Sequence, residues 1–449
     1  MTSFNRRTFC RNAATLFGFQ WVPAHVVRAQ NQNLLPSEKI RLAVIGCGGR
    51  GKVLLESMQD QDIVALCDVD EHRAADAFKS HPSARRFKDF RVMFDKMHKD
   101  IDAVVIATPD HTHVTATLAA LGHGKHVYCE KPLAHTVKEI RLMQEAALRA
   151  KVVTQVGNQG HSSHTIRLFS EMIQSGVIGN VSEIHAGCDA FRDVYCRIGK
   201  PPSPSSKPPA HIDWDLWLGP LKPQPYEPDA VPFKWRGFNT FGNGCVADWF
   251  CHIVDPSFWA LDLGAPIAIT AETKNYDPIR DAKFYPEGCR IIYEFAAKGN
   301  RGPVKLIWHD GCVGIPAPSE LAEDGRKVVG IGAVILGDKG KIMHGSHGAS
   351  SVRLIPESRM KGFKPPEQTI PRIDKGDHQR DWLEAIRANR AAGSSFAYGG
   401  SLSELGLLGM IAVRRSGQRL EWDSEAVAFK NDKVANTLLE KEYRPGWGL

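Results

Sequence analysis

The chain has 449 residues, of which 43% are hydrophobic and 24% are charged. This length is too great for one compact core and predicts two domains with additional segments, while the composition is typical of a globular protein. No run approaches the roughly 18 uninterrupted apolar residues of a transmembrane helix, so we expect no membrane partner. The formal net charge of +7 falls to +3 without the four arginines of the N-terminal segment described next, which argues against nucleic acid as a partner.

The first 29 residues have the composition of a targeting peptide. They contain four arginines and no acidic residue, with a modestly apolar stretch at residues 13–27. The sequence NRRTFCR, with Arg6 and Arg7, resembles a twin-arginine export signal. We expect residues 1–29 to be a twin-arginine signal peptide and the protein to be periplasmic; the alternative is a frayed basic N-terminus. Because this route exports folded proteins, a nucleotide cofactor would leave the cytoplasm already bound.

A short apolar run that ends in a cluster of glycines occupies residues 40–51 (IRLAVIGCGGRG). Its glycines match G-x-G-x-x-G, in which the first permits a tight turn, the second lets backbone approach a pyrophosphate, and the third allows close helix packing. The N-terminus of the following helix offers unpaired N–H groups to phosphates. The pattern predicts a nucleotide site, against the alternative of an ordinary βα turn. Its cofactor-binding candidates are Gly46, Gly48, Gly49, Arg50 and Gly51.

A carboxylate follows the second predicted strand. Residues 63–67 (IVALC) lead into Asp68, 17 residues beyond Gly51, where its side chain can accept hydrogen bonds from ribose hydroxyls. Asp70 lies close by, and the two carboxylates would repel a 2′-phosphate. We therefore predict NAD rather than NADP, with Asp68 as a cofactor-binding residue.

Apolar runs alternate with helix-like segments from residue 39 to about residue 156. This alternation predicts the α/β class and a doubly wound parallel sheet, with ligands at the carboxyl ends of its strands. Two of these strand ends, ATPDHTHV and GKHVYCEKP, carry residues that we expect to face the crevice. The alternative for Lys131 is a solvated loop lysine. The candidates at these two ends are Thr108, Pro109, His113, Glu130 and Lys131.

In this order and at these intervals, GCGGRG, CDVD, ATPDHTHV and GKHVYCEKPLAH resemble the Gfo/Idh/MocA family, which includes glucose-fructose oxidoreductase and inositol dehydrogenases. The resemblance runs from about residue 39 to the C-terminus, and EKP is its most specific element. It implies a Rossmann NAD-binding domain at residues 38–157. It also implies a substrate-binding and oligomerisation α/β domain at residues 158–370, built on a large open, mostly antiparallel sheet, and C-terminal helices and a tail at residues 371–449 that pack back on the core. A homo-oligomer, either a dimer or a tetramer, follows from the same resemblance.

Three polar residues share one face of a predicted helix that begins near Gly244. Asp248, His252 and Asp255 are spaced i, i+4 and i+7, and two acids and a histidine are unlike the apolar face that a soluble helix buries. In the family this position holds an Asp-x-x-x-His pair that works beside the EKP lysine. By that resemblance Lys131, Asp248 and His252 are the catalytic residues, and Asp255 orients His252 or caps the next segment. The alternative is a structural Asp-His pair.

The reaction explains why these residue types are needed together. Moving hydride from a secondary alcohol carbon to nicotinamide requires the hydroxyl proton to leave as well, and histidine has a suitable pKa for a general base. A lysine can polarise the oxygen and stabilise the negative charge that develops there. Lys131 and His252 both remain candidates for the base, and Asp248 is expected to place the hydroxyl or tune the histidine.

A further group is predicted to contact the substrate: Gln159, His161, Trp235, Arg236, Asn239 and Asp255. The first two lie where similar proteins approach the nicotinamide or the substrate. Trp235, Arg236 and Asn239 combine an aromatic face, a fork-shaped donor and an amide, which suit a pyranose ring. The alternative is that they belong to a strand with ordinary packing. His161 and His164 have i, i+3 spacing but no evident acidic partner, so no metal site is predicted.

The Pro- and Ser-rich residues 197–232 predict an ordered excursion over the surface, anchored by Trp214, Trp217 and Tyr226. The chain as a whole predicts an NAD-dependent oxidoreductase that moves hydride between a secondary hydroxyl carbon of a sugar or glycoside and a tightly bound nicotinamide. Two alternatives stay open. One is a redox-neutral, NAD-dependent glycoside hydrolase that oxidises its substrate transiently, eliminates the aglycone, adds water and returns the hydride. The other is a non-catalytic sugar-binding protein on the same fold.

Overall fold

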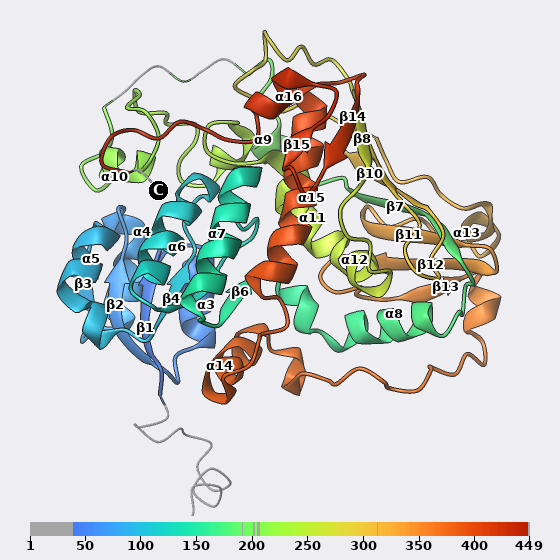
Figure 1. Cartoon of the computed structure of the whole chain (residues 1–449), viewed down its shortest axis with the longest axis horizontal. Helices are drawn as coiled ribbons and strands as arrows, with labels where there is room; N and C mark the ends of the chain where they lie inside the picture. Colours follow the sequence, from blue (N-terminus) through green and yellow to red (C-terminus); the bar gives the residue numbers. More distant parts are fainter. Residues whose placement is uncertain (1–38, 191, 201–202, 204–206, 312, 448–449) are drawn as a thin grey trace, which may run out of the picture.

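The computed structural model describes residues 39–190, 192–200, 203, 207–311 and 313–447, and the predicted twin-arginine segment lies outside them. Two sheets organise this part of the chain (Figure 1). A six-stranded sheet with its helices, drawn in blue to green, lies on one side, and a nine-stranded sheet, drawn mainly in yellow and orange, lies on the other. The α/β class predicted from the alternating segments is confirmed.

The six-stranded sheet belongs to the Rossmann domain and is parallel throughout. Its strands are β1 (Arg41–Ile45), β2 (Asp62–Cys67), β3 (Arg85–Phe87), β4 (Ala103–Ile106), β5 (His126–Cys129) and β6 (Thr154–Val156). They lie in the order β3-β2-β1-β4-β5-β6. The sequence does not predict β3, because two of its three residues are exposed arginines and the strand carries no apolar pattern.

Helices cover both faces of this sheet, which is why its central strands read as continuous apolar runs. The helices are α3 (Arg50–Ser57), α4 (Glu71–Ser80), α5 (Phe90–Met97), α6 (His113–Gly122) and α7 (Val137–Ala150). Successive residues of β1 enter opposite cores: Leu42 packs with residues of α3 and α4, and Ala43 belongs to the core that contains α5, α6 and α7.

The nine-stranded sheet is mixed and mostly antiparallel, as the resemblance implies. Its order is β13-β12-β11-β7-β10-β9-β8-β14-β15, and β7 and β10 form its parallel pair. The segment from residue 371 onward, predicted as helices and tail, also supplies the edge strands β14 and β15. The strands are β7 (Val181–Cys188), β8 (Ala268–Thr273), β9 (Cys289–Phe295), β10 (Val304–Asp310), β11 (Ile331–Gly337), β12 (Gly340–Gly345), β13 (Arg353–Ile355), β14 (Arg419–Asp423) and β15 (Ala428–Phe429).

Nine helices of the described part of the chain follow the Rossmann strands. They are α8 (His164–Gln174), α9 (Arg192–Tyr195), α10 (Trp214–Leu218), α11 (Gly244–Ile253), α12 (Asp255–Ala260), α13 (Ser319–Glu323), α14 (His378–Ala388), α15 (Phe396–Arg414) and α16 (Lys433–Thr437). Among the described helices, only α15 is long and apolar enough to cross a membrane, and 83% of that stretch is buried inside the protein. It contacts α7 of the Rossmann domain, α11 and β8. One large core therefore runs through both sheets.

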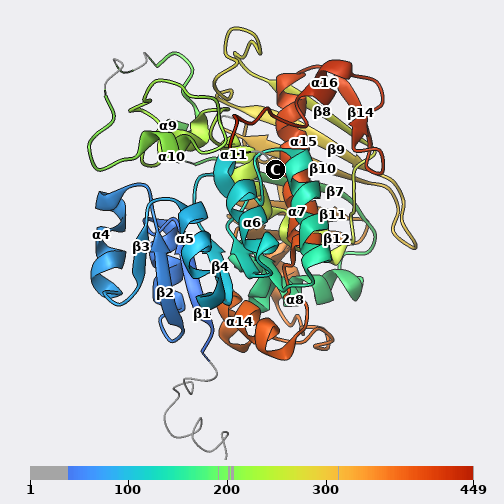
Figure 2. The same cartoon turned by 60° about the vertical axis from the view of Figure 1, so that its left-hand side comes forward.

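A segment that we call the strap, residues 207–237, crosses above the carboxyl ends of the Rossmann strands (Figure 2). It contains α10 and the 3-10 helix η5 (Lys234–Gly237). Its aromatic side chains form a separate cluster, in which Trp214 and Trp217 stack with ring centroids 4.7 Å apart. Main-chain hydrogen bonds attach it to the Rossmann domain, from Asp213 N–H to the Val69 oxygen (2.9 Å) and from Glu71 N–H to the His211 oxygen (3.0 Å).

Candidate active site

A cavity of about 390 Å³ opens at the carboxyl ends of β1, β2, β4 and β5, between the strap and α11. This edge is where parallel α/β sheets bind their ligands. Most of the residues predicted from the sequence line it: Gly46, Gly48, Gly49, Arg50, Asp68, Thr108, Pro109, Glu130, Lys131, Gln159, Trp235, Arg236, Asp248 and His252. The remaining predicted residues are not among its lining residues: Gly51, His113, His161, Asn239 and Asp255.

The glycine turn between β1 and α3 brings bare backbone to the cavity. Gly46 has a φ of +85°, and a Cβ there would lie 2.8 Å from the carbonyl carbon of Ala107. A Cβ on Gly51 would lie 1.8 Å from the Gly46 oxygen, so the missing side chain lets α3 approach the strand closely. Phosphates are bound at such turns by the N–H groups at the start of the helix.

Asp68 supports this turn from the end of β2. Its Oδ2 accepts a hydrogen bond from the Cys47 N–H (2.7 Å) and its Oδ1 accepts one from the Asp70 N–H (2.9 Å), while burial raises its pKa above the ordinary value. Thr108 lines the same cavity, and its buried Oγ1 has no hydrogen-bond partner within the described part of the chain. The bare glycine turn, the carboxylate beyond it and the unsatisfied hydroxyl fit a bound NAD.

Glu130, the acid of the EKP sequence, forms an ion pair with Arg50. Its Oε1 lies 2.7 Å from Arg50 Nε, and its side chain is only 7% exposed. Arg50 also donates from Nη2 to Gln159 Oε1 (3.4 Å). A buried carboxylate of this kind needs a partner, so Glu130 and Arg50 hold one another beside the glycine turn. Gln159 is joined to them from the start of the second domain.

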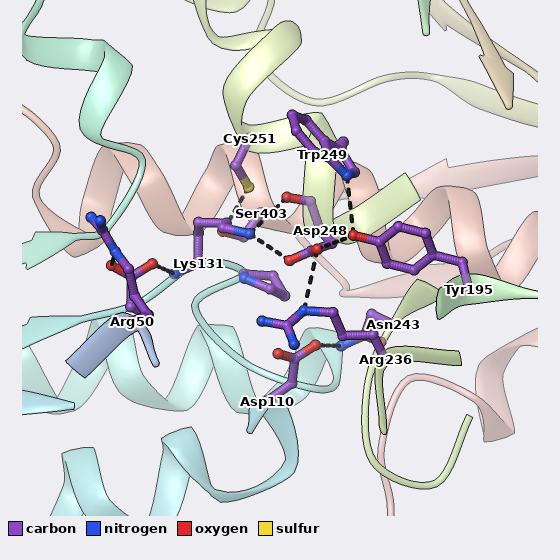
Figure 3. Close-up of polar contacts among 12 residues, drawn as sticks. Arg50, Asp110, Lys131, Tyr195, Arg236, Asn243, Asp248, Trp249, Cys251 and Ser403 are labelled. Carbon is purple, nitrogen blue, oxygen red and sulfur yellow. Dashed lines mark hydrogen bonds and ion pairs between the residues drawn. The ribbon is translucent and has the colours of Figure 1, made fainter. Parts of the chain in front are cut away.

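Lys131 meets α11 at Asp248 (Figure 3). The Lys131 ammonium donates to Asp248 Oδ1 and, at 3.0 Å, to the Asp248 main-chain oxygen. Tyr195 donates its hydroxyl proton to Asp248 Oδ2, and Arg236 Nε lies 3.4 Å from the same oxygen. Burial raises the pKa of Asp248, but the charges of Lys131 and Arg236 outweigh it and bring the pKa to about 2. Asp248 is therefore an ionised carboxylate whose two oxygens are both engaged.

His252 lies one turn further along α11 and lines the same cavity. Burial and the positive charge of Lys131 hold its pKa well below the ordinary value, so the ring is uncharged near neutral pH. Its buried Nδ1 has no hydrogen-bond partner among the described residues. The ring stacks on that of His347, with centroids 4.1 Å apart. An uncharged imidazole has a free lone pair, so His252 can accept a proton at this position of the cavity.

Sequence reasoning misses several residues of this site, among them Tyr195, Asp110 and His347. Asp110 stands inside ATPDHTHV between two predicted residues, so its position was a usable signal. Tyr195 follows β7 in a stretch with no recognised motif. His347 comes from the loop after β12, and only the packing of that loop against α11 brings it to the cavity.

His113 does not line the cavity, contrary to its assignment as a cofactor-binding residue. It is 1% exposed, and its Nδ1 and Nε2 lie 3.0 Å and 2.9 Å from the main-chain oxygens of Pro132 and Thr108. Burial lowers its pKa, but the nearby Cys129 thiol and these two carbonyls raise it to about 9. Both ring nitrogens of His113 are thereby engaged by main-chain oxygens. His113 thus clamps the loops that carry Thr108 and Lys131.

His161 and Asp255 pair with one another below the cavity. His161 Nδ1 lies 2.9 Å from Asp255 Oδ1, and Asn158 and Tyr398 also donate to this carboxylate. Of the two roles predicted for Asp255, neither is seen: its carboxylate is bonded to these three residues and not to His252, and although Asp255 opens α12, that helix has no side-chain cap among the described residues.

Asn239 also differs from its prediction as a sugar contact. Its Nδ2 donates to the Ala282 oxygen (3.2 Å), and its Oδ1 lies 3.2 Å from the Tyr285 hydroxyl oxygen. It lines a different cavity of about 230 Å³ behind the site. Its partners come from a loop distant in sequence, which is why the local pattern WRGFN gave no sign of this role.

Comparison with known families gives two matches. Residues 40–158 match the family described as an oxidoreductase family with an NAD-binding Rossmann fold, GFO_IDH_MocA, and residues 162–314 match the C-terminal alpha/beta domain of the same family. Together the two matches cover more than half of the chain.

Two curated relatives are dehydrogenases. Inositol 2-dehydrogenase 2 of Saccharopolyspora erythraea is 32% identical over 169 residues, which are 36% of this chain and 47% of that protein. Levoglucosan dehydrogenase of Pseudarthrobacter phenanthrenivorans is 27% identical over 216 residues, 48% of this chain and 46% of that protein. The chain thus spans about half the length of the curated relatives it matches.

Two solved structures share the fold at low identity. One is the WlbA dehydrogenase from Bordetella pertussis in complex with NADH and UDP-GlcNAcA, with a TM-score of 0.57, 18% identity, and coverage of 86% of this chain and 99% of that one. The other is a levoglucosan dehydrogenase in complex with NADH, with a TM-score of 0.54, 19% identity, and coverage of 84% and 98%.

Proposed function

Because the chain belongs to the Gfo/Idh/MocA oxidoreductase family and carries its NAD-binding Rossmann domain, we propose that it moves hydride between a secondary hydroxyl carbon of a sugar or glycoside and a tightly bound NAD. The observation that carries the proposal is the single cavity that joins the glycine turn and Asp68 at one end to Lys131, Asp248 and His252 at the other. The sugar dehydrogenases among the relatives support the substrate class.

The side chains divide the work of a hydride transfer. NAD, held at the glycine turn and Asp68, would supply the acceptor for the hydride. The Lys131 ammonium donates a hydrogen bond to the reacting oxygen and stabilises its developing charge. His252, uncharged in this site, is the better acceptor for the hydroxyl proton, since the Lys131 nitrogen already donates to the Asp248 carboxylate.

Asp248 holds Lys131 in place instead of binding the hydroxyl or tuning the histidine. Its oxygens are taken by Lys131, Tyr195 and Arg236. Such a fully bonded carboxylate fixes the position of an ammonium with little loss of entropy during the reaction.

The strap supports tight binding of the cofactor. Its residues Leu216, Trp217, Val231, Pro232 and Phe233 line the cavity above the glycine turn, so a dinucleotide there would lie between two parts of one chain. Together with the arginine pair at residues 6–7, this supports export by the twin-arginine route with NAD already loaded, and a periplasmic location. A fusion of residues 1–40 to a reporter protein tests the route. We expect the fusion to be exported, and we expect export to be lost when both arginines are changed to lysine.

We also infer a homo-oligomer, a dimer or a tetramer. One face of the nine-stranded sheet packs on the helices of the core, and α13 covers only part of the other through Leu321 and its contacts with β11, β12 and β13. Light scattering of the purified protein measures the number of subunits, and a monomeric mass contradicts the inference.

The first experiment follows the absorbance of the purified protein at about 340 nm, where reduced nicotinamide absorbs, while sugars and aryl glycosides are titrated in without added cofactor. A lasting rise is expected for net oxidation by bound NAD. Aglycone release without a lasting rise points to the redox-neutral hydrolase. A preparation that neither contains nor binds NAD contradicts the proposal.

Lys131→Ala separates an enzyme from a binding protein. We expect turnover to fall by about 100- to 1,000-fold, since one preorganised donor to the reacting oxygen is lost, while sugar binding to the NADH-loaded protein persists. Lys125→Ala, at the other end of β5, is the matched control and should keep full turnover. Equal turnover of Lys131→Ala and wild type would remove Lys131 from the reaction.

A further inference from the structure

Asp110 brings a second carboxyl into the cavity that holds Asp248. It opens the 3-10 helix η3 (Asp110–Thr112) in the loop that follows β4, is 3% exposed and lines the cavity. Asn243 Nδ2 donates to its Oδ2 (3.1 Å), and Figure 3 shows the other oxygen turned away from Asn243. The described residues provide no other side-chain hydrogen bond to this carboxyl, so one oxygen is available to a ligand.

Charges from three other elements face Asp110. Asp248 comes from α11, Arg236 from η5 and Lys131 from the end of β5. Burial raises the pKa of Asp110 most and the Asp248 carboxylate raises it further, while Arg236 and Lys131 lower it, and the result is a pKa of about 7. Two carboxyls in one site are thereby held at different protonation states, which is the usual arrangement where they have different roles.

Two further titratable side chains nearby do not change charge in the same range. Tyr285 donates its hydroxyl proton to the Gly242 oxygen (2.7 Å), and burial raises its pKa. Burial lowers the pKa of His111 to about 3, and its ring nitrogens lie against the main-chain oxygens of Trp217 and Phe241. Asp110 is therefore the group of this set that gains and loses a proton around neutral pH.

We propose that Asp110 binds a second substrate oxygen, on a carbon next to the one that is oxidised. Whether Asp110 carries a proton decides whether it can pair with an ether oxygen or only with a hydroxyl. The protonated carboxyl donates to an ether or glycosidic oxygen, and the carboxylate accepts from a free hydroxyl. The inference rests on the proposed function, because it places the reacting hydroxyl at Lys131 and His252. Asp248 cannot serve this second oxygen, since its own oxygens are engaged.

The consequence is a substrate preference that changes with pH. A free hydroxyl can donate as well as accept, so it pairs with either form of Asp110. An ether oxygen has no proton to give, so a carboxylate facing it leaves both groups without a hydrogen bond, and such mismatches discriminate strongly between substrates. Glycosides or O-methyl sugars should bind well only on the acidic side of neutral pH.

The test uses the NADH-loaded protein, in which an oxidisable sugar binds without turnover. Quenching of the tryptophan fluorescence gives Kd for a sugar that the wild type oxidises and for the same sugar methylated on the neighbouring oxygen, at about pH 6 and about pH 8.5. For the wild type, we expect the Kd of the methylated sugar divided by the Kd of the free sugar to be higher at the alkaline pH than at the acidic pH, by about tenfold or more. In Asp110→Asn, whose amide donates at every pH, the ratio should stay constant.

A wild-type ratio that does not change with pH, or an Asp110→Asn variant that keeps the wild-type change, overturns the inference while sugar oxidation at about 340 nm still supports the proposed function. If no sugar is oxidised, the inference and the proposed function are both contradicted.

Infrared titration of the wild type provides a second measurement that does not depend on a variant folding. A carboxylic acid band that disappears around pH 7 is expected. It should be lost in Asp110→Asn and kept in Glu404→Gln, which removes a different buried carboxyl with a raised pKa. A wild type without such a band overturns the inference.

Discussion

The carboxyls of Asp110 and Asp248 lie in one cavity but meet different neighbours. Asp248 is bonded by a lysine and a tyrosine and lies beside an arginine, and these partners favour its charged form. Asp110 is bonded by one neutral amide and faces the Asp248 charge, which favours its neutral form. At the scale of single residues, the site is thus defined by which partners each buried charge has.

Asp110→Asn should change the stability of the protein in a pH-dependent way. The folded state raises the pKa of Asp110 from about 3.9 to about 7, so its stabilising contribution is full below about pH 3.9 and is lost as the pH rises through about 7. The asparagine side chain does not titrate, so its contribution to the free energy of unfolding does not change over this range. Urea unfolding should therefore show the free energy of unfolding of the variant, relative to the wild type, rising between about pH 4 and about pH 8 by up to about 4 kcal/mol. If the free energies of unfolding of the variant and the wild type differ by the same amount at the acidic and the alkaline pH, the raised pKa of Asp110 is contradicted.

Asp68→Ser should relax the choice between NAD and NADP. The carboxylate that would repel a 2′-phosphate is removed, while Arg73 and Lys88, which also line the cavity, remain to attract one. We expect the Kd for NAD to rise by about tenfold and the Kd for NADP to fall by at least about tenfold. Fluorescence titration with NADH and NADPH measures both, and an unchanged Kd for NADPH would mean that Asp68 does not exclude the phosphate.

At the scale of elements, α11 and the strap decide the shape of the site. α11 presents Asp248 and His252 on one face because four residues make about one turn, and Asn243 at its start holds Asp110. The strap closes the opposite side and is attached to the Rossmann domain by hydrogen bonds that include Asp213 to Val69 and Glu71 to His211. We expect its motion to control access to the cofactor.

His211→Ala tests this control. His211 Nδ1 lies 3.0 Å from Asp70 Oδ1, and its ring stacks on His72 with centroids 3.8 Å apart. Removing the imidazole should speed NADH dissociation by about tenfold, as measured by stopped-flow fluorescence. Lys222→Ala is the control in the same strap, because its pair with Glu442 is exposed and such pairs contribute little. Equal dissociation rates for His211→Ala and wild type would show that this contact does not hold the strap.

At the scale of the whole molecule, the C-terminal part of the chain completes the N-terminal domain. α14 packs Trp382 and Leu383 against the Rossmann sheet, in the same core as Leu42 and Val44 of β1. α15 contacts α7 on one side and α11 and β8 on the other. The two domains therefore share buried surface and should unfold together.

Trp382→Ala should destabilise the protein by about 3–5 kcal/mol, the usual cost of removing a large buried aromatic side chain. Trp382 is fully buried and its ring lies 5.7 Å from that of Tyr128 in β5. Calorimetry is expected to show one transition, shifted to a lower temperature. Leu148→Ala, at a side chain 79% exposed, is the control and should shift it little. Two separate transitions would contradict a shared core.

The amino-acid sequence by itself determined the strands of the Rossmann sheet other than β3, its glycine turn and the start of α11. These features depend on local patterns: continuous apolar strands, glycines at a fixed spacing, and polar residues four apart on one helix. The same locality explains why His252 and Asp248 could be placed together, and Lys131 at a strand end, before their contacts were visible.

Only the tertiary structure decided which of these side chains meet. His113 turned out to clamp two loops, Asp255 to pair with His161, and Tyr195 and Asp110 to enter the site, because each contact joins segments far apart in sequence. Burial and the position of neighbouring charges are properties of the packed chain, and they set the protonation of Asp110, Asp248 and His252.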